Sequence, residues 1–106
     1  MNMKLLLVTC LEDFKAEITA LLQQARVNIF SFTETTGVKT VHDGNLLDDW
    51  FGNKEGEFRS LLFFSFTTAE SAAEVVQLIH SFNENGGHHF PARVFIMQVE
   101  SSNYTP

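Results

Sequence analysis

The chain has 106 residues, of which 44% are hydrophobic and 19% are charged, a composition typical of one folded domain and not of a disordered polypeptide. Its formal net charge of −6 argues against nucleic-acid binding, because neutralising phosphates requires a surplus of Lys and Arg. The single cysteine, Cys10, excludes an internal disulfide and fits a reducing compartment.

The first two predicted elements are a strand and a helix. Residues 3–9, MKLLLVT, form an apolar run with the length of a buried strand. The run is too short to span a membrane and no signal-peptide cleavage region follows it, so we expect a cytoplasmic protein with no direct membrane insertion. Thr9 and Glu12 have the spacing of a capping box, and apolar residues then recur at helical spacing as far as Ala25 or Arg26.

Two further strands enclose a long loop. The pattern predicts strands at residues 27–36 and 59–67, joined by residues 37–58. A loop of this length is uncommon in a small domain unless it is functional or disordered. The apolar residues of the second of these strands alternate between its faces, with Leu61 and Phe63 on one face and Leu62, Phe64 and Phe66 on the other.

A second helix and a last strand complete the pattern. Thr67 and Glu70 repeat the capping-box spacing, apolar residues follow at helical spacing, and Gly86 and Gly87 are suited to a left-handed helix end. The fourth strand is predicted at residues 93–100, and we expect the polar tail, residues 101–106, to be frayed.

The order of elements predicts a single α+β domain over residues 1–106, a ferredoxin-like βαββαβ sandwich. In this fold a four-stranded antiparallel sheet carries both helices on one face. The strands are apolar on both faces, whereas an antiparallel sheet with one wet face normally shows polar alternation. We therefore expect other copies of the chain to cover the open face, because monomers rarely expose so large an apolar patch.

Several segments resemble the PII-like family of trimeric ferredoxin-fold signalling proteins, which is related to the CutA proteins of divalent-cation tolerance. The resemblance covers nearly the whole chain. It rests on the opening MKLLLVTC, the passage RVNIFSFTETTGVKT from second strand into long loop, the glycine turn after the second helix, and the closing RVFIMQVE. It implies a homotrimer in which three sheets pack face to face.

The resemblance also implies a ligand cleft between subunits, framed by the long loop and by the turn before the last strand. The residues that match its position are Thr36, Gly37, Lys39, Gly86, Gly87, His88, His89 and Arg93. Classical nitrogen-regulatory members have a basic, glycine-rich run in that turn, whereas here histidines follow the glycines and the long loop is acidic. The ligand is therefore left open, with an adenine nucleotide and a divalent metal ion both considered and neither supported by a specific motif.

The long loop would dock on a protein partner, such as a membrane transporter. Its apolar stretch LLDDWF offers Leu46, Leu47, Trp50 and Phe51 as anchors, which would otherwise pack on the trimer itself. The sequence indicates no nucleophile or catalytic base, so we expect a non-catalytic regulatory protein.

Two other functions compete with this one. In a metal-binding accessory protein of the divalent-cation tolerance type, His42, His88 and His89 would bind the ion, although solvated loop histidines explain the same residues. A small enzyme with an acylphosphatase-like fold needs an arginine in the loop after the first strand, and the segment CLEDF has none.

Overall fold

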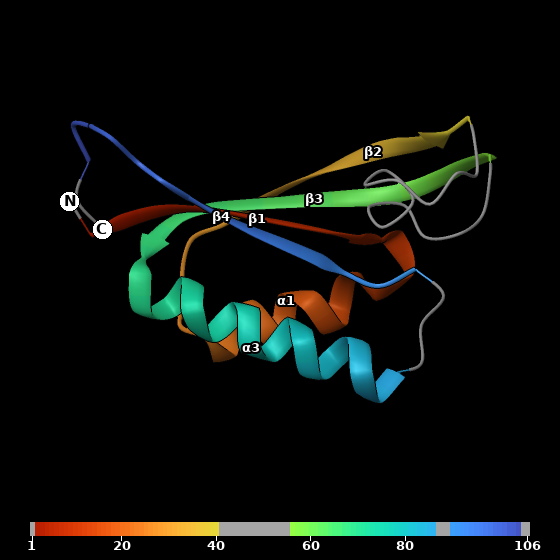
Figure 1. Ribbon diagram of the computed structural model, residues 1–106, viewed down its shortest axis with the longest axis horizontal. Coiled ribbons are helices and arrows are strands. Elements are labelled where there is room, and N and C mark those ends of the chain that lie inside the picture. The colour runs from red at the N-terminus through yellow and green to blue at the C-terminus, as the bar shows by residue number, and fades with distance from the viewer. Residues whose placement is uncertain (1, 41–55, 87–89, 105–106) are drawn as a thin grey trace.

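The computed structural model describes residues 2–40, 56–86 and 90–104. One antiparallel sheet in the order β2-β3-β1-β4 is covered on one face by both helices, which confirms the predicted α+β fold (Figure 1). Along the chain the elements are β1 (Met3–Leu11), a 3-10 helix (Glu12–Phe14), α1 (Lys15–Gln24), β2 (Ser31–Lys39), β3 (Gly56–Thr68), α3 (Ala69–Gly86) and β4 (Arg93–Gln98).

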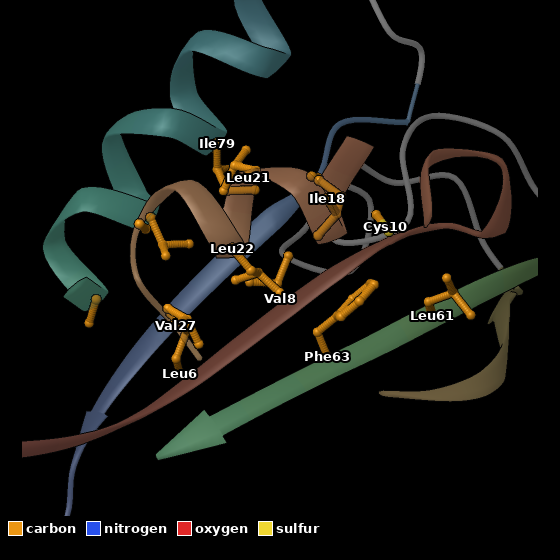
Figure 2. Close-up of a cluster of buried hydrophobic side chains, with 14 residues drawn as sticks. Leu6, Val8, Cys10, Ile18, Leu21, Leu22, Val27, Leu61, Phe63 and Ile79 are labelled. Atoms are coloured by element: carbon orange, nitrogen blue, oxygen red, sulfur yellow. The ribbon is translucent and has the colours of Figure 1, made fainter. Parts of the chain in front are cut away.

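The core lies between the sheet and the helices. Register places Val8 of β1 opposite Phe63 of β3, and both side chains point toward α1 and α3, where Phe63 is only 1% exposed (Figure 2). The helices contribute the buried residues Ile18, Leu21, Leu22, Ala72, Val75 and Ile79. The apolar residues that recur at helical spacing in α1 and α3 therefore pack on the apolar residues that alternate along the strands.

The first predicted capping box is wrong. Thr9 lies inside β1, paired with Leu62 of β3, and β1 continues to Leu11. The 3-10 helix then precedes α1, whose N-cap residue Phe14 makes no side-chain capping bond. Pairing with β3 gives Thr9 a place in the strand ladder, and this long-range pairing prevails over the local cap signal.

The second capping box is displaced by one residue. Thr67 is still in β3, opposite Lys4 of β1, and the backbone N–H of Ser71 donates to the Oγ1 of Thr68 at 3.2 Å. Thr68 therefore caps α3 in place of Thr67. At the other end Gly86 is the last helical residue, not a left-handed cap, and Gly87 lies outside the described residues.

The long connection is shorter than predicted. Gly37 pairs with Phe58, and Lys39 pairs with Gly56, so both ends of the predicted loop 37–58 belong to strands. Gly56, at the start of β3, has a φ of 118°, which only glycine adopts without strain. Residues 41–55 lie outside the described part of the chain.

Strand β2 begins later than predicted because α1 ends in a tight turn. Arg26 adopts a φ of 65°, and the amides of Arg26 and Val27 donate to the carbonyls of Gln23 and Leu22. These two bonds form a Schellman motif, with arginine where glycine is usual. Val27 is consequently buried in the core, and regular pairing begins only at Ser31.

At the end of the chain, β4 stops at Gln98 and not at Glu100, although the amide of Val99 still donates to the carbonyl of Met3 at 3.4 Å. Residues 101–104 have no regular structure, and Tyr104 lies in a groove with Ile29 and Phe66. Neither helix in the described residues is long and apolar enough to cross a membrane.

Candidate functional site

The face of the sheet opposite the helices carries an apolar patch. Alternation along the strands places on it the exposed side chains of Phe64, Phe66, Phe95 and Met97, which are 36%, 47%, 36% and 44% exposed. With Leu5 and Leu7 of β1 they form two rows across β3, β1 and β4. One row consists of Phe64, Leu7 and Phe95, and the other of Phe66, Leu5 and Met97. The single chain therefore leaves one of its two apolar sheet faces uncovered, and we call these six residues the open-face patch.

The same face becomes polar toward the ends of β2 and β3. Thr35, Ser60 and Leu11 form a row across three strands, and Thr9 lies one row closer to the open-face patch. These residues line a cleft of about 40 Å³, which Cys10, Phe58, Phe90 and Pro91 complete. A hydroxyl-lined cleft is thus continuous with the apolar surface.

The cleft joins two segments that are far apart in the sequence. Phe58 lies two residues after the start of β3, and Phe90 precedes β4; their ring centroids are 4.8 Å apart. The side-chain amide of Asn83 in α3 also bonds to both backbone polar groups of Ala92, just before β4. Figure 1 shows that α3 ends on the side of the molecule where β4 begins.

The structure places the predicted ligand residues Thr36, Gly37 and Lys39 in β2. Thr36 lies in β2 opposite Arg59, on the helix-facing side, so the neighbouring Thr35 lines the cleft in its place. A role for Thr36 in ligand binding stays a prediction. Gly37 and Lys39 are also strand residues, both buried, and Lys39 is 4% exposed.

The predicted residues before the last strand are only partly described. Gly86 is helical, and Arg93 opens β4 opposite Thr9, which places its side chain on the face of the sheet that carries the cleft. A cation on this face favours an anionic ligand. The remaining predicted residues, Gly87, His88 and His89, lie outside the described residues, as do the metal and partner candidates His42, Leu46, Leu47, Trp50 and Phe51.

Cys10 contributes no reactive thiol to the cleft. Its side chain points into the helix-covered core, and it is 5% exposed (Figure 2). Burial, and next the nearby carboxylate of Glu17, raise the pKa of Cys10 from 9.0 to about 12. The thiol stays protonated at neutral pH, as a structural cysteine does.

Metal ligands do not gather in the described ranges. Among residues 2–40, 56–86 and 90–104, no three His, Cys, Asp or Glu side chains lie close enough to hold one ion. The exposed His80 and Glu84, paired across one turn of α3, are two potential ligands on a surface helix.

Sequence reasoning did not find most of the cleft. Thr35, Phe58, Phe90 and Pro91 were not singled out, because they come from segments that only the fold brings together. No local pattern of the sequence marks them.

No family model and no curated protein sequence matches the chain. Solved structures do match it. A DUF3240 family protein from Shewanella baltica OS155 is 18% identical with a TM-score of 0.68, covering 100% of this chain and 99% of that one. CPII from Thiomonas intermedia K12, a nitrogen regulatory PII-like protein bound to ADP, AMP and bicarbonate, is 16% identical with a TM-score of 0.68, covering 97% and 96%.

A third match is a PII-like signalling protein from Thermus thermophilus, which is 9% identical with a TM-score of 0.59 and covers 91% of this chain and 88% of that chain. Identities this low establish shared architecture. The chain therefore has the fold of PII-like proteins, as its sequence predicts.

Proposed function

We propose, from its PII-like fold, that the protein is a non-catalytic regulatory protein that binds a small anionic ligand between copies of itself. Three chains would assemble through their open-face patches. The ligand would lie where the cleft of one chain meets a neighbour, and the complex would act on a partner protein in the cytoplasm. One observation carries the proposal: the hydroxyl-lined cleft is continuous with an uncovered apolar face.

The free energy of burying apolar side chains favours the covering of the open face by other copies of the chain. Burying a Phe or Met side chain fully contributes roughly 1.5–3 kcal/mol relative to leaving it exposed. Four such side chains of the open-face patch are more than one third exposed in the single chain. Their burial would contribute on the order of several kcal/mol per copy, comparable with the net stability of a small domain.

The size of the cleft supports a ligand site shared between chains. Pockets that hold small organic ligands have volumes of roughly 300–1,000 Å³. The cleft of one chain measures about 40 Å³, enough for a few water molecules. A neighbour packed on the open face would extend the walls of the cleft, since the two surfaces are continuous.

The chemistry around the cleft favours an anion. Thr9, Thr35 and Ser60 provide hydroxyl groups that can donate hydrogen bonds, and Arg93 lies across from Thr9. CPII, which shares the fold, binds ADP, AMP and bicarbonate. An adenine nucleotide, with or without bicarbonate, is therefore the ligand we propose to test first.

Regulation would require only that the ligand bind two states of the protein unequally, which shifts their populations. The connection between β2 and β3, residues 40–55, would contact the partner through Leu46, Leu47, Trp50 and Phe51. A membrane transporter is one such partner, and co-purification with candidate membrane proteins in the presence and absence of ADP would identify it.

Isothermal titration calorimetry with ADP, AMP, bicarbonate and zinc tests the proposal. We expect saturable binding of ADP or AMP, and at least a tenfold weaker affinity for Arg93→Gln, since a charged hydrogen bond contributes roughly 1.5–3 kcal/mol. Arg59→Gln is the matched control, because Arg59 lies on the helix-facing side beside Glu12. Binding of zinc alone would favour the metal-binding function, and no binding of any probe would contradict the proposal.

A further inference from the structure

Asn83 holds the segment that forms one wall of the cleft. It lies near the end of α3 and is half-buried. Its side-chain Nδ2 donates to the carbonyl of Ala92 at 2.8 Å, and its Oδ1 accepts from the amide of Ala92 at 2.9 Å. The side chain thus pairs with Ala92 as a neighbouring strand would, through one donor and one acceptor.

This pair of bonds acts directly on the cleft. Ala92 is 1% exposed and belongs to the core, and the two residues before it, Phe90 and Pro91, line the cleft. The ring of Phe90 rests on Phe58 of β3. The wall is therefore held at both ends, by an apolar contact to β3 and by a polar contact to α3.

We infer that Asn83 is a positioning residue for the ligand cleft: by fixing Ala92, it holds Phe90 and Pro91 where a ligand would meet them. This inference rests on the function proposed above. Asn83 acts on the wall through Ala92. Asparagine alone among side chains of this length offers both an N–H donor and a carbonyl acceptor.

Helix propensity does not favour asparagine at position 83. Asparagine lowers helix propensity relative to alanine, so Asn83→Ala should strengthen α3 locally while it removes both bonds to Ala92. A loss of ligand affinity in this variant would therefore come from the wall and not from a weaker helix. Asn83→Asp is the sharper variant, because it keeps the shape and an acceptor but loses the donor and places a carboxylate against the carbonyl of Ala92.

The test compares Asn83→Asp and Asn83→Ala with Asn85→Asp, an exposed position two residues on that undergoes the same change of charge. ADP titration of the full chain should give roughly tenfold weaker binding for both Asn83 variants. The control should bind like the natural protein. All three should sediment alike, and the amide of Ala92 should exchange faster only in the Asn83 variants.

Two results would overturn the inference: unchanged ADP affinity in both Asn83 variants, or weaker ADP binding in these variants without faster exchange of the Ala92 amide. If the natural protein binds none of ADP, AMP and bicarbonate, the proposed function is wrong, and the positioning role of Asn83 is wrong with it. Binding by the natural protein together with equal binding by the Asn83 variants would remove the positioning role alone.

Discussion

The two faces of β3 are made of the same kinds of residue and have different surroundings. Phe63 points toward α1 and α3 and is 1% exposed, whereas the next residue, Phe64, points away from the helices and is 36% exposed. Phe66 repeats this exposure two residues on, at 47%. The difference is one of cover and not of chemistry, because the helices within residues 2–40, 56–86 and 90–104 lie on one face of the sheet (Figure 1).

This contrast indicates where the protein's folding and its assembly are encoded. The covered face has its apolar side chains, its helices and its core in a single polypeptide (Figure 2). In the described part of the chain, the open face carries apolar side chains with no helix packed on them. We interpret the covered face as the determinant of folding and the open face as the determinant of association.

The largest effect is expected on the covered face. Phe63→Ala should lower the free energy of unfolding by about 3–5 kcal/mol, the usual cost of removing a buried phenylalanine and leaving a cavity. Urea denaturation followed by circular dichroism measures this loss. A change below about 1 kcal/mol would show that Phe63 is not central to the core.

A charge on the open face should affect association instead. Phe66→Glu should shift sedimentation toward single chains, because association would require burial of an unpaired carboxylate. Phe32→Glu is the matched control, since Phe32 is 43% exposed but belongs to the helix-facing side, with the Lys15 Nζ 4.4 Å from its ring centroid. Dissociation by both variants equally would remove the distinction between the faces.

A smaller, stabilising effect is expected at the end of α1. Arg26→Gly should raise stability by roughly 0.5–1 kcal/mol, because glycine adopts the positive φ of this position without the cost that a side chain imposes. Since Arg26 lies outside the open-face patch, the gain should be the same at every protein concentration. Thermal melts at several concentrations check this, and a lower melting temperature would contradict it.

An effect confined to alkaline pH is expected at the covered thiol. Because the pKa of Cys10 is raised to about 12, the folded protein keeps this proton when the unfolded chain has lost it above pH 9.0. Stability from this source is complete below pH 9.0 and falls as the pH rises toward about 12. Denaturation across this range should show a steeper decline for the natural protein than for Cys10→Ala, and parallel declines would refute the assignment.

The helical and strand periodicities of the apolar residues predict the order of elements, and this order predicts the fold. Strand alternation places Leu61 and Phe63 on one face and Phe64 and Phe66 on the other, as the structure has them. The same periodicities do not predict where elements end. The local spacing predicts Thr9 as a helix cap, although its backbone is paired with β3, and such pairing depends on residues far along the chain.

The candidate site was predicted less well for the same reason. The sequence pattern predicts Gly37 in a loop, but it lies opposite Phe58, and no local pattern reports that pairing. The cleft residues Thr35, Phe58 and Phe90 come from three separate segments. Arg93, which the resemblance to PII-like proteins implies as a ligand residue, lies opposite Thr9 of the cleft, and its role stays a prediction.

Sedimentation equilibrium of the natural protein at micromolar concentration tests the central claim most directly. We expect the sedimenting particle to have three times the mass of one chain, with the open-face patch buried between copies. A single-chain mass across the whole concentration range would contradict it, and with it the proposed ligand site between chains.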